Sequence, residues 1–368
     1  MVYLDNAATG FPKSNAVWEA MRNAFFTCGN PSRSSHAYAR NADEILYRCR
    51  VLLAERFGSL PEEVVLTKNA TEALNLAIKG LYREGGEVLT SDMEHNAVLR
   101  PLHALRSAGK ITVKQFRVSL SDDDVTVENF RLAAGKTVSM AVVTHASNVC
   151  GRVLPLRKMR AAVKNKELLL VADCSQTAGH IPINIRELGA DVICIPGHKG
   201  LYGPMGTGAL ICNPDRHLQF RTILEGGSGI QSLSMQMPEA LPERLEAGTQ
   251  NVYGYAGLAA ALEELVYPKE EFRLGELLVE KLRRREDIRL YGIGTGGQYL
   301  PVVLFNKHGV DCEALAEILA EKGIAVRGGY HCAPAAHRAI GSRDAGGVRV
   351  SLGRSNTSED IKALLDAI

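Results

Sequence analysis

The sequence predicts an α/β protein in which a mostly parallel sheet carries helices on both faces and a smaller α+β C-terminal domain follows. Short runs rich in Val, Ile and Leu alternate with helical patterns through the first two-thirds of the 368-residue chain. The runs are continuously apolar, as expected of strands buried on both faces. Such alternation is typical of a parallel sheet covered by helices. The expected strands are Val64–Thr67, Glu87–Thr90, Ile111–Val118, Val138–His145, Leu168–Asp173, Asp191–Ile195 and Gly208–Cys212.

Helical patterns fill the intervals between these strands. After His36, apolar residues between Ile45 and Phe57 recur at the spacing of one helix face, with charged residues off that face. Other helical patterns follow Asn69, His95 and Pro155. Ligands of such sheets bind beyond the carboxyl ends of the strands, so residues that follow strands are the first candidates for a site.

The rhythm changes near Gly248, which indicates a second domain. We predict a large domain over residues 15–255 and a small domain formed by 1–14 and 256–368, with a boundary between 250 and 270. The elements expected there are helices at Ala256–Leu265, Leu274–Arg284, Cys312–Lys322 and Ser358–Ala367, and strands at Leu300–Phe305 and Val348–Leu352.

Composition excludes several classes of protein. The 43 Lys plus Arg nearly balance the 41 Asp plus Glu, which argues against partners such as nucleic acid or an acidic membrane surface. No apolar run approaches the roughly 18 residues that a membrane span needs. The start Met1–Asp5 lacks the basic and hydrophobic pattern of a signal peptide. We therefore expect a soluble, cytoplasmic protein.

The eight cysteines form no C-x-x-C pair, so neither a zinc site nor any other metal site is predicted. Cys174, Cys194 and Cys212 lie in apolar runs, where cysteine usually acts as a small hydrophobic residue. Cys332 differs, because it lies in the polar, glycine-containing segment Arg327–Pro334 beside basic residues. A thiolate could form there.

A lysine follows the expected strand Asp191–Ile195, inside the glycine-rich turn Ile195–Gly206. Burying an ammonium group is costly, so a lysine at such a place is unusual. Desolvation lowers the pKa of a lysine and leaves a neutral amine that can condense with an aldehyde. Lys199 is therefore a candidate nucleophile, and the alternative is an ordinary solvated turn lysine.

Two further strand ends carry polar groups. Asp173 ends a strand about one strand–helix–strand unit before Lys199, so both could stand at neighbouring strand ends. Pyridoxal phosphate needs such a carboxylate against its pyridinium nitrogen, although an acid at a strand end is also a common turn or cap residue. His95 follows the strand Glu87–Thr90 and could stack on an aromatic cofactor; a lone histidine is more often structural.

The segment Thr67–Ala73 passes from a strand into a helix. The backbone N–H groups of Ala70 and Thr71 at that helix start could hold a phosphate. Ordinary capping by Asn69 and Thr71 explains the same residues and is the favoured interpretation of this segment taken alone.

A phosphate cradle, an imidazole, a strand-end acid and a turn lysine occur in this order along the chain. With these features the sequence resembles the fold-type I pyridoxal-phosphate enzymes of the class V aminotransferase group. Within that group it is similar to the cysteine desulfurase and selenocysteine lyase family. The motifs that carry the resemblance are Leu4–Thr9, Asn69–Asn75, Met93–Asn96, Thr144–Asn148, Gly197–Lys199, Glu246–Asn251 and Arg327–Ala333.

The resemblance implies a role for each matching residue. Lys199 would bind pyridoxal 5'-phosphate covalently and shuttle protons, His95 would stack on the ring, and Asp173 would pair with its nitrogen. An arginine suits a substrate carboxylate because its planar fork makes two parallel hydrogen bonds, although a strand-edge ion pair would also explain Arg349. The implied cofactor contacts are Gln176 to the phenolic oxygen, Ala70, Thr71 and His198 to the phosphate, and Thr249 to the phosphate from a second subunit of a homodimer. Asn148 would contact both the cofactor and the substrate, and Arg349 and Arg327 would contact the substrate.

Cys332 would be the residue that accepts sulfur. The resemblance implies that its thiolate attacks the sulfur of substrate cysteine, giving a persulfide and alanine, and a further protein could take the sulfur. The short approach from Arg327 to Cys332 resembles Suf-type desulfurases and selenocysteine lyases rather than the Nif/Isc type. Selenocysteine lyase, and an aminotransferase or C–S lyase that does not use Cys332, are alternatives. A non-catalytic cofactor-binding scaffold is a third interpretation.

The sequence departs from the family pattern at two places. Pro196 stands where relatives usually carry Ser or Thr, so a hydroxyl and an N–H near the phosphate are missing. We predict weaker retention of the cofactor than in relatives. Arg354 and Ser355 stand where relatives often carry an aromatic pair, and the sequence offers no functional account of them.

Overall fold

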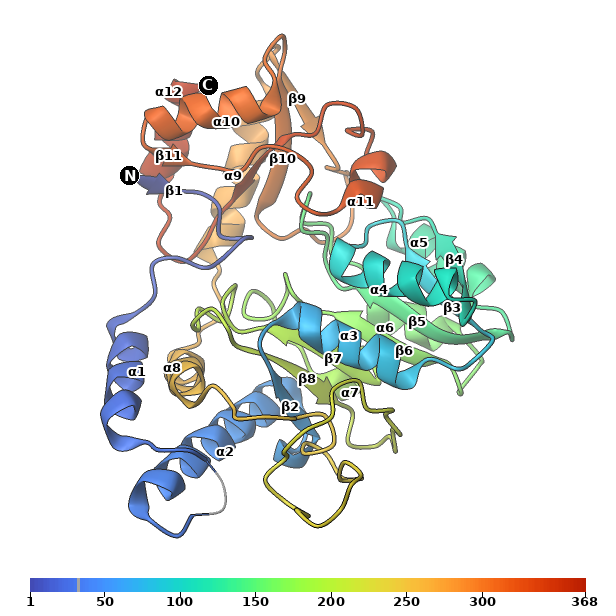
Figure 1. Ribbon diagram of the computed structural model, residues 1–368. Coiled ribbons are helices and arrows are strands. Elements are labelled where there is room, and N and C mark those ends of the chain that lie inside the picture. Colours follow the sequence, from blue (N-terminus) through green and yellow to red (C-terminus); the bar gives the residue numbers. More distant parts are fainter. Residues whose placement is uncertain (32–33) are drawn as a thin grey trace.

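The computed structural model describes residues 1–31 and 34–368. In these residues the largest sheet has seven strands in the order β2-β8-β7-β6-β5-β3-β4 (Figure 1). The strands are β2 (Val64–Thr67), β3 (Gly86–Ser91), β4 (Ile111–Phe116), β5 (Val138–Thr144), β6 (Leu169–Asp173), β7 (Val192–Pro196) and β8 (Gly208–Cys212). Strands β3 to β7 pair in parallel, which confirms the predicted fold class.

Strand β8 runs antiparallel to both of its neighbours, β7 and β2. A parallel neighbour would need a crossover connection, usually a helix, of a dozen or more residues. The turn from Pro196 to Gly208 contains no helix, so the chain reverses directly. The turn that carries Lys199 is thereby fixed between two paired strands.

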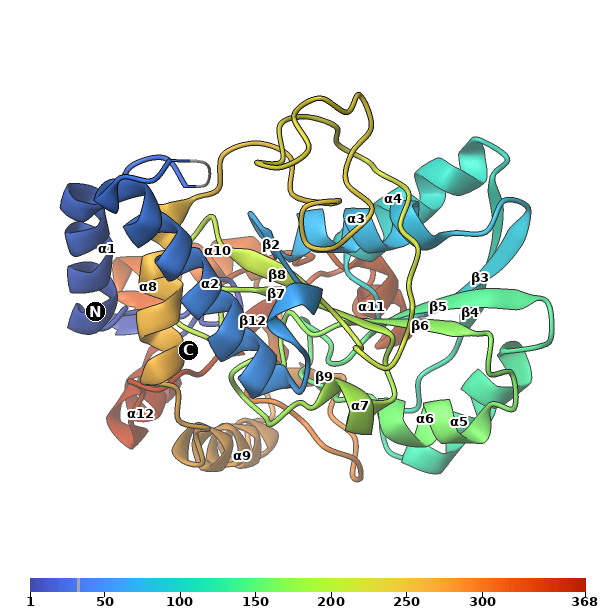
Figure 2. The ribbon, with the colours of Figure 1, turned by 90° about the horizontal axis from the view of Figure 1, so that it is seen from below.

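Helices cover both faces of this sheet (Figure 2). Helices α3 (Ala70–Leu81) and α4 (Asn96–Ser107) pack on one face through residues such as Leu74 and Leu102. Phe57, Phe130 and Met159 belong to the apolar cluster on the other face. The helices that supply this second cluster include α2 (Ala37–Phe57), α5 (Asp123–Ala133), α6 (Leu156–Ala162), α7 (Ile185–Leu188) and α8 (Val252–Glu263).

The small unit contains, within the described residues, a three-stranded antiparallel sheet in the order β12-β10-β9. Its strands are β9 (Ile288–Tyr291), β10 (Val302–Lys307) and β12 (Val348–Ser351), and its helices are α9 (Glu270–Arg283), α10 (Cys312–Glu321), α11 (Pro334–Ala339) and α12 (Ser358–Ala367). Leu4, Leu274, Phe305 and Leu364 share one apolar cluster, so the start of the chain packs with its last third.

The N-terminal segment joins the two units. Strand β1 (Val2–Tyr3) pairs in parallel with β11 (Ile324–Ala325) beside the small sheet (Figure 1). Further along, the N–H of Gly10 donates to the carbonyl of His198 at 2.9 Å, and the Thr9 hydroxyl donates to the same oxygen. The residue before Lys199 is therefore tied to a segment anchored in the small unit.

Helix α8 crosses residue 255, where we drew the boundary of the large domain. It packs against α1 (Asn15–Thr27) and α2 on the large unit. The division into domains stays a prediction. Within the part of the chain that the structure describes, none of the helices has the length and apolar character that a membrane span requires.

Candidate active site

Most of the candidate residues come together at the carboxyl ends of the parallel strands. They line one pocket between the starts of α3 and α4 and the ends of β5, β6 and β7. The pocket contains Ala70, Thr71, His95, Asn148, Asp173, Gln176, Pro196, His198 and Lys199. Because parallel strands end at the same edge of a sheet, residues far apart in the sequence meet there.

Lys199 lies in this pocket, at the start of the turn between β7 and β8. Burial lowers the pKa of its amine to about 8; Arg349 and Arg327 act in the same direction, and Asp173 opposes them. A substantial fraction of the amine is therefore neutral near physiological pH. This is the form that reacts with aldehydes.

The acid and the imidazole are both held by local hydrogen bonds. The buried Asp173 accepts from the N–H of Ser175 at 2.9 Å and from its hydroxyl. His95 caps helix α4, because its Nδ1 accepts from the N–H of Ala97 at 3.0 Å. Burial, with Lys199 as the next cause, lowers the pKa of His95 to about 4. The ring is therefore neutral, with its proton on Nε2.

The start of α3 forms an anion cradle. Asn69 caps the helix by accepting from the N–H of Glu72 at 2.9 Å, while the first N–H groups of a helix have no partner within it. A Cβ atom at Gly208 would lie 2.9 Å from Asn69 Cα, so β8 can run against the helix start only with glycine. Negative groups are stabilised at such a helix terminus.

His198 contributes an unpaired ring nitrogen. Its Nδ1 atom is buried and has no hydrogen-bond partner among the described residues. Burial lowers the pKa of the ring to about 4, so the ring is neutral. A buried polar atom without a partner is rare in folded proteins, and this one belongs to a residue that lines the pocket, where a bound ligand could pair with it. The cradle, the orphaned nitrogen, the acid and the amine are together suited to a phosphorylated aromatic aldehyde.

Pro196 is the last residue of β7, pairs with Gly208 and lines the pocket. We expect Pro196→Ser to lower the dissociation constant for pyridoxal phosphate by about tenfold, since a hydrogen bond to a charged group adds roughly 1.5–3 kcal/mol. Equilibrium titration of the apoprotein, followed by cofactor fluorescence, measures the effect. The exposed Pro182, changed to Ser, is the control. An unchanged or weaker constant in Pro196→Ser would contradict the prediction.

Arg349 lies in β12 with its side chain buried. Its Nη2 pairs with the Asp5 carboxylate at 2.7 Å, and its Nη1 donates to the carbonyl of Asn148 at 3.0 Å. The ion pair that we considered as an alternative is thus present. The Nε atom is nevertheless buried without a partner in the described residues, so the guanidinium keeps a free donor.

The Cys332 loop reaches the pocket from the small unit. The carbonyl of Cys332 accepts from the N–H of Asn96 at 2.8 Å, directly after His95. The carbonyl of His331 accepts from the Asn148 amide at 2.8 Å. All eight cysteines lie in described residues, and Cys332 is the exposed one. The candidate nucleophile is therefore accessible and anchored to two residues beside the pocket.

Comparison with known proteins identifies the family. The model of the family described as aminotransferase class-V matches residues 2–364. The chain belongs to the class V aminotransferase family. This family generally depends on pyridoxal phosphate, and the first resemblance that we described is confirmed.

The class V relatives of this chain are named as cysteine desulfurases. A probable cysteine desulfurase of Methanothermobacter thermautotrophicus is 32% identical, with 99% of this chain and 92% of the relative covered. One from Xylella fastidiosa is 33% identical over 100% of this chain and 90% of the relative. The apo structure of cysteine desulfurase from Thermococcus onnurineus superposes with a TM-score of 0.88 at 28% identity, covering 99% and 93% of the two chains.

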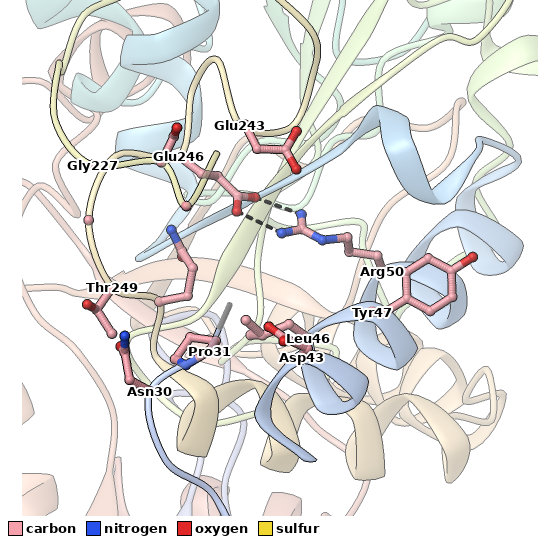
Figure 3. Close-up of a pocket in the computed structure, with 14 residues that line it drawn as sticks. Asn30, Pro31, Asp43, Leu46, Tyr47, Arg50, Gly227, Glu243, Glu246 and Thr249 are labelled. Carbon is pink, nitrogen blue, oxygen red and sulfur yellow. Dashed lines mark hydrogen bonds and ion pairs between the residues drawn. The ribbon is translucent and has the colours of Figure 1, made fainter. Parts of the chain in front are cut away.

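Thr249 does not line the pocket that contains Lys199 in the same chain. It lines a separate hollow with Asn30, Asp43 and the bidentate pair of Arg50 and Glu246, whose two contacts are each 2.7 Å (Figure 3). It follows Gly248 in the long connection between β8 and α8. The contact that we expected from a second subunit stays a prediction.

Two acids of the site were not predicted from the sequence. Asp5 belongs to the motif Leu4–Thr9, from which no role was predicted for it, and it pairs with Arg349. Glu94 is buried and accepts from the N–H of Thr144 at 2.9 Å, and burial raises its pKa to about 8. Its place directly before His95 was the available signal, but sequence position does not reveal burial.

The structure also accounts for Arg354. Its guanidinium carbon lies 4.5 Å from the centre of the Tyr202 ring, and the backbone N–H of Arg354 donates to the Tyr202 hydroxyl at 2.8 Å. An arginine stacked on an aromatic face is stabilised by cation–π attraction. Arg354 therefore packs behind the turn that carries Lys199.

Proposed function

We propose that this protein is a pyridoxal-phosphate-dependent cysteine desulfurase, which transfers sulfur from L-cysteine to Cys332 as a persulfide and releases alanine. The observation that carries the proposal is the anchoring of an exposed cysteine loop beside a pocket with a desulfurase-like set of groups. Lys199, His95 and Asp173 form that set. The names of the relatives support this chemistry over an aminotransferase or C–S lyase that would not use Cys332.

The residues present fit the cofactor. Lys199 would hold it covalently, Asp173 would keep the ring nitrogen protonated, and His95 would stack on the ring. When bound, pyridoxal phosphate supplies an electron sink for the negative charge that develops at the substrate Cα. The remaining contacts would be Gln176 to the phenolic oxygen, and Ala70, Thr71 and His198 to the phosphate.

Lys199 and His95 would carry out the proton transfer and hydrogen bonding of the reaction. The Lys199 Nζ, with its pKa lowered to about 8 by burial, can take up the proton of the substrate Cα and return it. The neutral His95 ring presents an Nε2–H and can donate a hydrogen bond without carrying charge. A group whose pKa lies near the working pH is best suited to both directions of transfer.

Sulfur transfer would be carried out by Cys332. Its thiolate attacks the substrate sulfur, and a new S–S bond forms as the substrate Cβ–S bond breaks. The electron pair of the broken bond passes to Cβ, which takes up a proton and becomes the methyl group of alanine. The oxidised sulfur stays on the enzyme as a persulfide, so no external oxidant is needed.

The substrate carboxylate would be bound by Arg349, with Asn148 and Arg327 beside it. We expect Arg349→Lys to raise the KM for L-cysteine by about tenfold or more, because a lysine cannot reproduce the planar fork held by Asp5. Steady-state kinetics over a range of cysteine concentrations measures it. The exposed Arg22, changed to Lys, is the control, and an unchanged KM in Arg349→Lys would refute the assignment.

The test of the proposed function is a substrate screen with the purified holoprotein. L-cysteine should yield alanine and sulfide in equal amounts with a reductant, and mass spectrometry should find 32 Da added to the Cys332 peptide before reduction. L-selenocysteine in a parallel reaction tests the lyase alternative. Release of neither alanine nor sulfide would reject the proposal.

We further propose that the protein acts as a homodimer in which Thr249 reaches the phosphate of the opposite subunit. The support is its place in a hollow away from the Lys199 pocket of its own chain. Sedimentation of the holoprotein tests the assembly. A second protein that accepts the persulfide is compatible with the exposure of Cys332.

A further inference from the structure

A chain of buried hydrogen bonds runs from the loop before Cys332 into α11 and the turn that follows it. His331 Nε2 lies 3.0 Å from the carbonyl of Arg327, and His331 Nδ1 lies 3.2 Å from His337 Nε2. The last link joins His337 Nδ1 to the Ser342 hydroxyl at 2.8 Å. His331, His337 and Ser342 are 3%, 0% and 1% exposed.

The carbonyl at one end sets the direction of every bond in this chain. Since a carbonyl only accepts, the proton of His331 is on Nε2 and its Nδ1 accepts from His337 Nε2–H. His337 Nδ1 in turn accepts from the Ser342 hydroxyl. Burial lowers the pKa of His331 to about 3 and that of His337 to about 4, so both rings are neutral and every link is satisfied.

These hydrogen bonds support a loop backbone with an unusual conformation. His331 and Cys332 have φ values of 51° and 54°, the left-handed conformation that residues other than glycine rarely adopt. Such a conformation persists only where the surroundings hold it. Asn96 and Asn148 bind the two carbonyls from the pocket side. The His331 side chain is bonded to the carbonyl of Arg327 and to His337 of α11.

We propose that His337 and Ser342 are positioning residues that act through His331 to hold Cys332 in the conformation that meets the substrate sulfur. This inference rests on the proposed function of Cys332 as sulfur acceptor. His337 belongs to α11 and Ser342 to the turn after it, and neither lines the Lys199 pocket. Their effect would be carried entirely by the loop conformation.

The test compares two changes at the same position in the holoprotein. His337→Leu removes both hydrogen bonds, whereas His337→Gln keeps an amide that can donate to His331 and accept from Ser342. We expect His337→Leu to exchange the amides of residues 329–333 about fivefold faster and to form the persulfide about tenfold more slowly. The KM for cysteine and the cofactor absorbance should change little. His337→Gln should restore both rates to within about threefold of the parent.

Each result bears on the proposal. Parental exchange and parental persulfide rates in His337→Leu overturn it, and so does faster exchange without a slower persulfide step, which indicates a merely structural contact. If His337→Leu does not fold, Ser342→Ala decides; unchanged exchange and rate there also overturn the proposal. His103→Leu, at an exposed histidine of α4, is the matched control. Turnover that does not require Cys332 would reject the proposed function. The amide-exchange rates of residues 329–333 would still show whether the hydrogen bonds of His337 hold the loop.

Discussion

Replacing Cys332 with alanine is expected to lower the rate of alanine release from L-cysteine roughly a thousandfold, as the loss of a catalytic nucleophile commonly does. Without the thiolate, nothing in the described loop can accept the substrate sulfur. The cofactor should still bind, because the residues proposed to hold it lie on the sheet edge and not on this loop. Single-turnover production of alanine, with the cofactor absorbance recorded in parallel, measures both.

Cys28→Ala is the control for this experiment. Cys28 is half-buried at the end of α1, and the remaining cysteines apart from Cys332 are buried. It should keep the parental rate and leave the persulfide on the Cys332 peptide. Continued alanine release by Cys332→Ala at a rate near the parent would mean that sulfur leaves by another route, as in a C–S lyase.

Lys199→Ala is expected to abolish covalent capture of pyridoxal phosphate and to reduce desulfuration about ten-thousandfold or more. The pocket would keep its acid, its imidazole and its anion cradle, so non-covalent binding should survive with weaker affinity. Borohydride reduction followed by mass spectrometry should find the modified peptide in the parent and not in the variant. The exposed Lys68, beside the same cradle, provides the control as Lys68→Ala.

The capture of the cofactor by the apoprotein should depend on pH in a defined direction. Burial lowers the pKa of Lys199 from 10.5 to about 8, and the neutral amine is the reactive form. The capture rate should therefore rise as the pH is raised through about 8 and level off above it. Stopped-flow measurement of the absorbance change tests this. A rate that keeps rising toward pH 10 would show that the amine is not desolvated.

The strands and the pocket could be predicted because both depend on local patterns. A continuous apolar run predicts a buried strand, and polar residues after such runs meet at one sheet edge whatever the connections between them. Asp173, His95 and Lys199 were found in this way. The relatives and the family model add the chemistry, since the residue types alone favoured an ordinary solvated turn lysine and a structural histidine.

The remaining features depend on contacts that a sequence pattern does not contain. The antiparallel direction of β8 cannot be predicted from its apolar residues, since a strand buried on both faces has the same pattern in a parallel or an antiparallel pairing. The pair of Asp5 and Arg349 joins residues from opposite ends of the chain. Nothing in the sequence distinguishes Glu94 from an exposed turn acid, because its burial depends on how the strands around it pack. The chain from His331 to Ser342 depends on which ring nitrogen carries each proton.

The N-terminal segment has a mechanical consequence. Residues 2 and 3 pair with β11 in the small unit, while residues 9 and 10 donate hydrogen bonds to the carbonyl of His198, directly before Lys199. We expect a displacement of the small unit, which carries Cys332, to be transmitted through the main chain of this short segment to the turn that contains Lys199. The N-terminal segment thus connects the turn of the lysine that we propose to hold the cofactor to the unit that carries the proposed sulfur acceptor.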